Sequence, residues 1–369
     1  MNILILNPIL YSGDGNKIPK VRTIKDTMIY GMGLGFKSLG HSVTLIAVDE
    51  YKPLEAEKYD FEILFFKNNL KNVFPSALPY SQGIYNYIKH HSKCYDMILS
   101  SETFSFNSLF AALFVPQNTV IWQELNLHQH KFFTIPSRIW HNITIPLFFR
   151  KIRVVIPRSE SAFTFISRYM ENVCDKKVDH GINIEKFKVS GCKKRQFISV
   201  ARLIDQKNID VIIKRFYEFI QDVNYQDFKL LIAGKGPMER ELHNLVTELD
   251  INQNVEFIGF MDHNKLNHFI SESYASLVNT SRDLNMVSIP ESIVSGTPVI
   301  TNMVPALANY INENKLGIAK DDWGRQEMSK IIEDNEFENN CILFREKLST
   351  KQAAKTIIDI FYQYESPAN

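Results

Sequence analysis

The sequence of 369 residues has few cysteines, no long apolar run and almost no net charge. The four cysteines lie far apart and form no Cys-x-x-Cys pair, so neither a zinc site nor a disulfide framework is indicated, and a reducing cytoplasm is the expected compartment. No apolar stretch approaches the roughly 20 residues that a membrane-spanning helix needs, and the first residues lack the pattern of a signal peptide. The net charge of +1 gives no case for nucleic-acid binding. We therefore expect a cytoplasmic protein whose partners are small molecules or are recognised locally.

The composition, with 45% hydrophobic and 22% charged residues, is that of a globular protein long enough for two domains. In the first half, short apolar runs alternate with helical patterns, which indicates an α/β fold with a parallel sheet covered by helices. The predicted strands are residues 3–6, 43–48, 61–65, 95–99, 119–122 and 153–156. The predicted helices are residues 23–39, 80–91, 106–114, 137–149 and 160–170. Ligands of such sheets bind beyond the carboxyl ends of the strands, so the loops at 11–17 and 123–130 are expected to border a site.

The second half repeats this pattern after a hinge at 189–194, with predicted strands at 196–201, 229–233 and 274–278 and an apolar run from 255. Asn208 is expected to cap a helix, and its apolar face holds Ile209, Ile212, Ile213, Phe216 and Ile220. A last helix is predicted at 351–364, with one face formed by Ala354, Ile357, Ile358, Phe361 and Tyr362.

Residues 281–300 are predicted to form a loop, a short helix and a strand. Pro290 suits the first helical position, and Gly296 ends the helix. Asp283 in the loop and Glu291 in the first turn would then face one spot beside the N–H groups of the helix start, where carboxylates suit sugar hydroxyls and amides suit phosphate. For each acid alone, the simpler interpretation is a turn residue or a partner of the helix dipole.

Two cations, Arg202 and Lys207, flank a strand-to-helix loop at the same expected edge. Arginine offers forked donors and lysine a point charge, a pair that suits a diphosphate. Two solvated surface cations are the alternative. Gly236 belongs to a Gly-x-Gly turn followed by Pro237, at the end of the next predicted strand.

These motifs resemble, in order, those of glycosyltransferase family 4, a retaining group with the GT-B fold. Residues 283–300 resemble its Glu-x7-Glu signature, with Asp283 and Glu291 in the acidic positions. Residues 202–208 resemble its Arg-Leu-x-x-x-Lys-Gly, with Asn208 in place of the glycine, and residues 179–187 resemble its Pro-Asn-Gly-Val-Asp-x-x-x-Phe.

The resemblance implies two doubly wound Rossmann-like domains facing each other across a cleft. The acceptor-binding domain would be 1–188 with the helix at 351–369, and the nucleotide-sugar-binding domain would be 189–350. The implied reaction is retaining transfer of a sugar from a nucleoside-diphosphate sugar, UDP rather than GDP, to a hydroxyl of a glycan, lipid-linked or small-molecule acceptor in polysaccharide biosynthesis. The sequence lacks the Asp-x-Asp of the metal-dependent architecture, so no metal and no cofactor are expected.

In the implied site, Arg202 and Lys207 stabilise the leaving diphosphate, Asp283 holds a hydroxyl of the donor sugar, and Glu291 holds the ribose. The other expected donor-binding residues are Gly236, Phe260, Met261, Asn285, Met286, Val287 and Ser288.

Family members carry a histidine near the end of the fourth or fifth strand, but here that place holds Glu124. Glu124 is therefore expected in the acceptor-facing catalytic role, with His128 or His130 as substitutes. After the first strand, a loop against phosphate or sugar is expected from Gly13, Asp14 and Gly15, with a simple turn as the alternative.

Residues 137–153 mix basic and aromatic side chains, namely Arg138, Trp140, Phe148, Phe149, Arg150, Lys151 and Arg153. We expect a partly buried helix; the alternative is peripheral contact with the anionic inner face of the cell membrane. Two other functions remain open, a donor-binding partner module without activity and a sugar-nucleotide epimerase.

Overall fold

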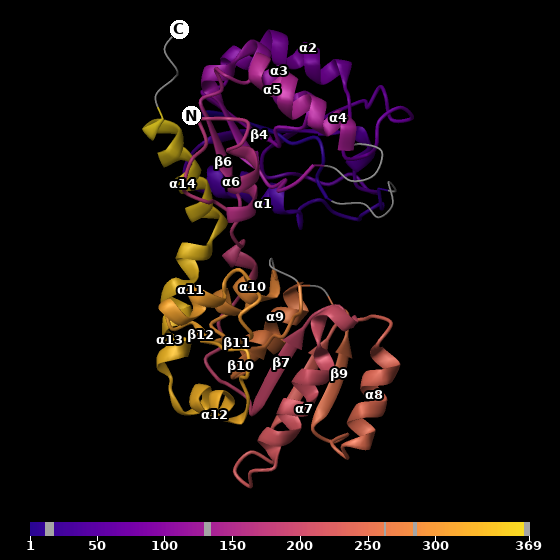
Figure 1. The fold of residues 1–369 in the computed structure, drawn as a ribbon, viewed down its shortest axis with the longest axis vertical. Helices are drawn as coiled ribbons and strands as arrows, with labels where there is room; N and C mark the ends of the chain where they lie inside the picture. The colour runs from indigo at the N-terminus through magenta and orange to yellow at the C-terminus, as the bar shows by residue number, and fades with distance from the viewer. Residues whose placement is uncertain (12–17, 129–133, 262, 283–285, 365–369) are drawn as a thin grey trace. The chain divides into compact units, whose positions relative to one another are not determined.

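The computed structural model describes residues 1–11, 18–128, 134–261, 263–282 and 286–364, and the chain divides into two compact units (Figure 1). The first unit joins Met1–Gly181 to Ser349–Asn369, and the second is Ile182–Leu348. The sequence analysis placed these divisions later, at 188/189 and 350/351. Residues 182–187 fall to the second unit because Ile182 and Phe187 pack in one of its buried apolar clusters.

The first unit is built on a parallel sheet of six strands in the order β3-β2-β1-β4-β5-β6. The strands are β1 (Asn2–Leu6), β2 (Ser42–Val48), β3 (Glu62–Phe66), β4 (Met97–Ser101), β5 (Thr119–Gln123) and β6 (Val154–Pro157). The helices of this unit are α1 (Met28–Ser38), α2 (Gln82–His91), α3 (Phe106–Phe114), α4 (Thr134–Ile139), α5 (Ile145–Phe148), α6 (Glu160–Ile166) and α14 (Thr350–Gln363). All six predicted strands are confirmed. They could be recognised in the sequence because helices cover the sheet, so that its strands can be apolar on both faces.

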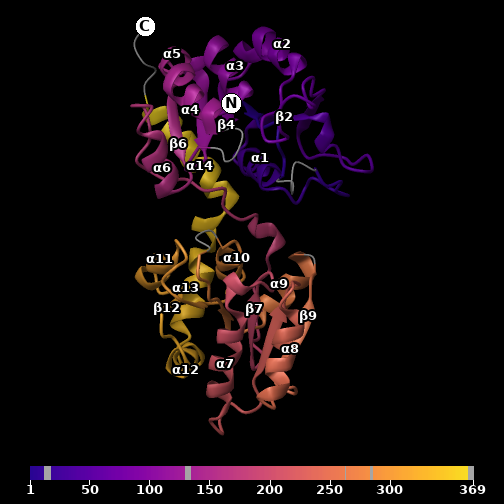
Figure 2. The same ribbon diagram turned by 45° about the vertical axis from the view of Figure 1, so that its right-hand side comes forward.

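Helix α14 returns to the first unit, where it packs against α1 (Figures 1 and 2). The two helices approach closely because α1 presents glycine: a Cβ added to Gly35 would lie 2.5 Å from the carbonyl oxygen of Thr350. At the other end of α14, the Arg153 guanidinium donates to the carbonyl oxygens of Phe361 and Tyr364, each at 3.1 Å. It also lies 4.1 Å from the centre of the Phe361 ring. A cation thus satisfies carbonyl groups at the end of the helix, where the helix dipole favours positive charge.

The second unit repeats the architecture with the strand order β12-β11-β10-β7-β8-β9, again all parallel. Its strands are β7 (Gln196–Val200), β8 (Lys229–Ala233), β9 (Val255–Gly259), β10 (Ala275–Leu277), β11 (Val299–Thr301) and β12 (Gly317–Ala319). Its helices are α7 (Ile209–Ile220), α8 (Glu239–Glu248), α9 (His263–Ser271), α10 (Ser288–Val294), α11 (Ala308–Glu313), α12 (Arg325–Glu333) and α13 (Glu336–Phe344). The predicted apolar face of α7 is confirmed, since all five of its residues are buried.

Each sheet has one place where the strand order reverses, between β1 and β4 in the first unit and between β7 and β10 in the second. In doubly wound sheets, the loops that leave such a pair diverge to opposite faces and open a crevice at the carboxyl edge. The loops after β7 and β10 carry the motifs found in the sequence. The two switch points are therefore the places where chemistry is expected.

Several predicted helix boundaries were wrong. The helix predicted at 23–39 begins only at Met28, because the Glu57 carboxylate accepts hydrogen bonds from the Thr23 hydroxyl (2.7 Å) and the Ile24 N–H (3.0 Å), and Thr27 then caps the helix. Pro290 is the third residue of α10 and not the first, since that helix begins at Ser288.

The helix predicted at 137–149 consists of α4, a π-helical segment (Trp140–Thr144) and α5. Tyr362 does not share the buried face of α14, because 64% of its surface is exposed. Lys193 of the predicted hinge is packed into the second unit, where its ammonium donates to the carbonyl oxygens of Ser271 (3.0 Å) and Gly296 (2.9 Å).

Candidate functional site

The loops at the carboxyl edge of the second sheet are tied to one another by backbone hydrogen bonds. The N–H of Leu203, after β7, donates to the carbonyl oxygen of Lys235, after β8 (3.0 Å). The N–H of Ser281, after β10, donates to the carbonyl oxygen of Gln206 (3.0 Å). Three loops that are distant in sequence therefore form one connected surface around the β7/β10 switch point.

Gly236 is required by this arrangement. A Cβ at this position would lie 2.1 Å from the carbonyl oxygen of Leu203, and the contact is with backbone, which cannot swing aside. Gly234 adopts a φ of +142°, and its added Cβ would meet the carbonyl oxygen of Ala201 at 1.9 Å. The Gly-x-Gly turn thus lets the loop after β8 lie directly on the loop that carries Arg202.

The two predicted cations differ in environment. Arg202 is exposed, whereas Lys207 lies at the end of a 3₁₀ turn and is only 6% exposed. The following residue, Asn208, has a left-handed backbone (φ 44°), and its side chain does not cap α7, contrary to prediction. Its amide contacts Asn279, after β10 (3.4 Å). Asparagine tolerates the left-handed region better than most residues, which explains how Asn208 can occupy the position that is glycine in the motif it resembles.

Helix α10 begins at the same edge of the sheet. Met286, Ser288 and Glu291 are buried, whereas 49% of the Val287 surface is exposed. The buried hydroxyl of Ser288 has no hydrogen-bond partner within the described ranges of the chain. The loop before α10 is anchored at Thr280, whose N–H donates to the Asn302 side chain at the end of β11 (3.2 Å).

The last part of the donor prediction lies after β9. Phe260 is 79% exposed there, an aromatic ring open to stacking. Met261 instead packs against a buried cluster of the sheet. Asp283 and Asn285 lie outside the described residues, as do Gly13, Asp14, Gly15 and His130.

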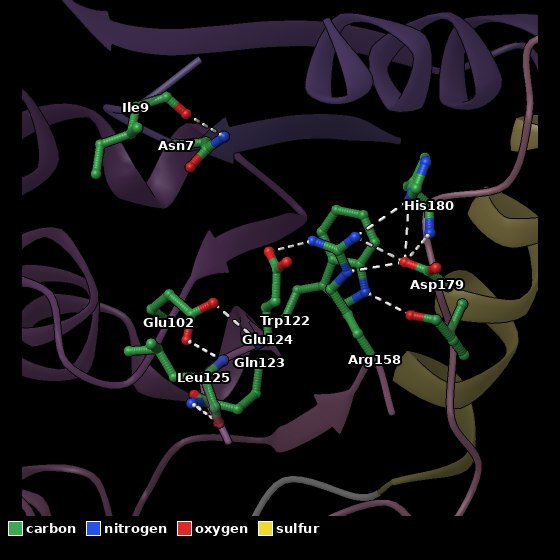
Figure 3. Close-up of polar contacts among 11 residues, drawn as sticks. Asn7, Ile9, Glu102, Trp122, Gln123, Glu124, Leu125, Arg158, Asp179 and His180 are labelled. Atoms are coloured by element: carbon green, nitrogen blue, oxygen red, sulfur yellow. Dashed lines mark hydrogen bonds and ion pairs between the residues drawn. The ribbon is translucent and has the colours of Figure 1, made fainter. Parts of the chain in front are cut away.

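At the carboxyl edge of the first sheet, the structure brings Glu124 together with two residues that the sequence analysis did not identify, Glu102 and Arg158 (Figure 3). Glu102 follows β4, Glu124 follows β5, and Arg158 follows β6. The Arg158 guanidinium lies 2.5 Å from the Glu124 carboxylate and 2.7 Å from that of Asp179, and it stacks at 4.8 Å over the Trp122 ring.

Glu102 holds the backbone beyond β5. Its two carboxylate oxygens accept the N–H groups of Glu124 (2.9 Å) and Leu125 (3.1 Å). Burial raises the pKa of Glu102 to about 7, against the lowering effect of these two donors. A carboxyl group with this pKa can change its protonation state near neutral pH.

His128 does not share this cluster. Its Nδ1 lies 3.1 Å from the Ser137 hydroxyl and its Nε2 lies 3.0 Å from the Tyr169 hydroxyl, so both ring nitrogens are engaged. The ring packs edge-on against His141 and Phe165. Burial lowers the pKa of His128, with help from two arginine charges. The geometry therefore favours Glu124 over His128 at the edge of the sheet.

The segment from α4 to α5 is partly buried, as expected: Arg138, Phe148, Arg150 and Lys151 are exposed, whereas other named residues are buried or engaged. Trp140 donates its indole N–H to the Thr103 carbonyl oxygen (2.9 Å), Phe149 is fully buried, and Arg153 binds the end of α14. Four exposed apolar side chains are spaced four residues apart, namely Ile135 (70%), Ile139 (52%), Ile143 (54%) and Leu147 (66%), and Phe148 (43%) is exposed next to the last of them. We refer to these four residues as the aliphatic stripe. No helix in the described part of the chain is long and apolar enough to cross a membrane.

A cavity of about 330 Å³ lies beyond β2 and β3. Its lining includes Lys20, Glu50, Asn68, Lys71 and Phe74. Lys20 donates to the Glu50 carbonyl oxygen (2.9 Å), and the Asn68 amide donates to the Glu50 carboxylate (2.8 Å). The cavity lining thus combines two ammonium groups, one carboxylate and one aromatic ring. Within the described ranges, no group of three or more His, Cys, Asp or Glu side chains could hold a metal ion.

A known family and several known proteins are similar to this chain in sequence. Residues 183–361 match the family described as glycosyl transferases group 1. Alpha-monoglucosyldiacylglycerol synthase of Streptococcus pneumoniae is 24% identical over 186 residues, 46% of this chain and 42% of that protein. O-antigen biosynthesis glycosyltransferase WclY of Escherichia coli is 22% identical over 281 residues, 70% of this chain and 76% of that protein. This chain spans less than half the length of the first curated relatives that it matches.

The solved structure of Anabaena Alr3699/HepE in complex with UDP covers 98% of this chain and all of its own, with a TM-score of 0.63 and 13% identity. At this identity the likeness shows the fold alone, which is the arrangement of two Rossmann-like domains known as GT-B. The fold and the family match agree with the motifs at the edge of the second sheet, and they confirm the resemblance seen in the sequence. The chain therefore has the GT-B fold, and its residues 183–361, just under half of its length, match the glycosyl transferases group 1 family.

Proposed function

We propose that this chain is a retaining glycosyltransferase that moves a sugar from a nucleoside-diphosphate sugar to a hydroxyl acceptor. The observation that carries the proposal is the connected surface at the β7/β10 switch point, where Gly236, Lys207 and Glu291 come from three separate loops or helices. A nucleotide is the kind of ligand that such an edge accepts.

In the proposed donor complex, Arg202 and Lys207 bind the diphosphate, and the buried Ser288 hydroxyl supplies a further hydrogen bond. Glu291 accepts the ribose hydroxyls, and Phe260 offers an aromatic face to the base. Asp283 is proposed to hold a hydroxyl of the transferred sugar. We propose UDP before GDP, a choice supported by the fold neighbour HepE, whose structure is a complex with UDP.

In the proposed reaction, the bond from the anomeric carbon to the diphosphate oxygen breaks while the acceptor oxygen bonds to the same carbon on the same face. The acceptor proton passes to the leaving diphosphate oxygen, so no separate base is required. Arg202 and Lys207 offset the negative charge that grows on the diphosphate, which is the electrostatic contribution expected of preorganised cations. We propose that the reaction proceeds without a metal ion, and that chelation by EDTA leaves its rate unchanged.

The acceptor is proposed to bind at the carboxyl edge of the first sheet, with Glu124 in contact with its hydroxyl group. The cavity lined by Lys20 and Lys71 lies at the same edge and suits an acidic group of the acceptor. The names of two relatives, a diacylglycerol glycolipid synthase and an O-antigen glycosyltransferase, support a lipid-linked or polysaccharide acceptor.

Contact with a lipid surface is part of this proposal, through the aliphatic stripe and the basic residues beside it. Between Glu124 and Glu160 the sequence contains no acidic residue, while Arg138, Arg150 and Lys151 are exposed within that span. Apolar side chains flanked by cations on an acid-free segment complement an anionic membrane interface.

The donor is tested by a thermal-shift panel of UDP, GDP, ADP and their sugar forms on wild type and Glu291→Gln. Glu239→Gln is the matched control, because Glu239 also lies in the first turn of a helix, α8. We expect one nucleotide to raise the melting temperature of wild type and of the control, but not of Glu291→Gln. No shift with any nucleotide would refute the donor site.

Product analysis then separates the alternatives. A new glycoside with the anomeric configuration of the donor supports retaining transfer, and an inverted product refutes it. Donor binding without transfer to lipid-linked or polysaccharide acceptors would indicate a binding module. Recovery of an epimerised nucleotide sugar would indicate an epimerase.

The membrane contact is tested by sedimentation with vesicles of phosphatidylcholine alone or mixed with phosphatidylglycerol. We expect wild type to sediment with the anionic vesicles and the pair Ile139→Gln and Leu147→Gln to stay in solution. The control pair is Val223→Gln and Leu343→Gln, since both side chains are as exposed (76% and 78%) but lie in the second unit. Equal sedimentation of both pairs would contradict the proposed contact.

A further inference from the structure

Glu102 has an unusual backbone conformation and lies beside the switch point of the first sheet. It follows β4 directly, on one side of the β1/β4 switch point of the first sheet. Its φ of +65° lies in the left-handed region, which residues other than glycine and asparagine rarely adopt. A strained residue persists only where the surrounding structure fixes it, and such residues cluster at functional sites.

Three hydrogen bonds fix Glu102 to the end of β5. Its N–H donates to the carbonyl oxygen of Trp122 (3.2 Å), and its carboxylate oxygens each accept one N–H, from Glu124 and Leu125. The ladder between β4 and β5 ends at the pair Ser101 and Trp122. Beyond the last pair of this ladder, the Glu102 carboxylate therefore accepts the backbone hydrogen bonds of the chain where it leaves β5 (Figure 3).

Arg158 holds the same segment from the other side. Its N–H donates to the Gln123 carbonyl oxygen (2.8 Å), while its guanidinium binds the Glu124 carboxylate. The backbone of Glu124 is therefore set by Glu102, and its side chain is set by Arg158. Removing either would leave Glu124 attached at one point only.

We propose that Glu102 is a positioning residue for the acceptor side of the transfer reaction, acting through the backbone of Glu124 and Leu125. This inference rests on the proposed function for its chemical meaning. Its physical content, that the ionised Glu102 carboxylate holds these two amides, is independent of any substrate.

Protonation of Glu102 removes one of the two backbone hydrogen bonds that its carboxylate accepts. An ionised carboxylate accepts both N–H groups, whereas a carboxylic acid keeps one good acceptor oxygen and has a hydroxyl on the other. The charges that face Glu102 are the Glu124 carboxylate and the Arg158 guanidinium, and Arg158 in turn contacts Asp179 and His180. Because the pKa of Glu102 is about 7, its carboxylate accepts both N–H groups above that pH and loses one of them as the pH falls below it.

Hydrogen exchange of the Glu124 and Leu125 amides tests the inference directly on the intact chain. In wild type, we expect protection, corrected for the intrinsic exchange rate, to fall at least several-fold from pH 8 to pH 6. In Glu102→Gln, the amide group accepts only one N–H, so protection at pH 8 should be roughly tenfold lower and independent of pH. Glu160→Gln, an exposed acid on the neighbouring α6, should behave as wild type.

The outcomes are distinct. Wild-type protection that does not change with pH would overturn the proposal, and this arm decides the question even if Glu102→Gln fails to fold. Loss of the pH dependence in His180→Gln but not in Glu102→Gln would assign the effect to the imidazole and also overturn it. The nucleotide-induced thermal shift should be the same in Glu102→Gln as in wild type. A wild type that binds no nucleotide but shows the expected exchange would refute the proposed function, while the hydrogen bonding of the Glu124 and Leu125 amides by Glu102 would still stand.

Discussion

Replacing Gly236 with alanine should weaken nucleotide binding by displacing the loop after β8 from the loop that carries Arg202. The added Cβ would lie 2.1 Å from the Leu203 carbonyl oxygen, whereas real Cβ atoms essentially never approach closer than 3.0 Å, so the two loops must separate by at least the difference, 0.9 Å. Leu203 is buried and hydrogen-bonded to Lys235 and Met238, so it cannot yield alone.

A misplacement of about 1 Å can cost an enzyme about 100-fold in activity. For the nucleotide, we therefore expect an affinity lower by 10- to 100-fold, which corresponds to about 1.4 to 2.7 kcal/mol. Isothermal titration calorimetry with the nucleotide identified by the thermal-shift panel measures this loss of affinity directly, at a temperature where circular dichroism shows wild type and Gly236→Ala to be folded.

Gly191→Ala is the matched control, because a Cβ at Gly191 would meet nothing within 4 Å. Its nucleotide affinity should equal that of wild type. The reasoning is refuted if Gly236→Ala binds as tightly as wild type. It is refuted equally if Gly191→Ala loses as much affinity, since that would show a general sensitivity of this unit to alanine.

Three further predictions concern stability. Arg153→Ala removes hydrogen bonds to the end of α14 and should lower the free energy of unfolding by about 3 kcal/mol in urea titrations, with a smaller loss in Arg138→Ala, whose side chain is exposed. Burial lowers the pKa of His141 to about 4, so its contribution to stability is complete above pH 6.5 and is lost as the pH falls towards 4; His141→Phe should remove a pH-dependent change of up to about 3 kcal/mol. Lys193→Met should lower the free energy of unfolding by about 3 kcal/mol, because it leaves two buried carbonyl oxygens unpaired. Lys194→Met is the control: its ammonium forms an ion pair, but the side chain is 60% exposed, so the loss should be less than about 1 kcal/mol. Equal losses in the two variants would refute the role of burial.

The sequence predicted the sheets well because their strands are short apolar runs, and β1 is a good example, with Ile3 to Leu6 fully buried. It failed where a distant residue decides the local structure. Glu57 delays the start of α1 from more than thirty positions away, and no periodicity near Thr23 records that contact.

The same distinction applies to the sites. In the second unit, each loop carries its own motif, so Arg202, Gly236 and Glu291 could be predicted as site residues one at a time, and they remain predictions. In the first unit, Glu102 and Arg158 lie close to Glu124 only because β4, β5 and β6 pair, which places three strand ends beside one another. The one local signal for them in the sequence is a charged residue immediately after each of two apolar strands.

The division of the chain also has a consequence for the order in which the protein folds during synthesis. The second unit is one continuous segment, complete once Leu348 has left the ribosome. The first unit is interrupted, because α14 contributes Ala354, Ile357 and Phe361 to the same core as β1. Until α14 has been synthesised, the nascent first unit exposes the apolar surface of α1 that α14 later covers, and partly folded states of this kind are prone to aggregation. The unit that is translated first is thus the last to be completed.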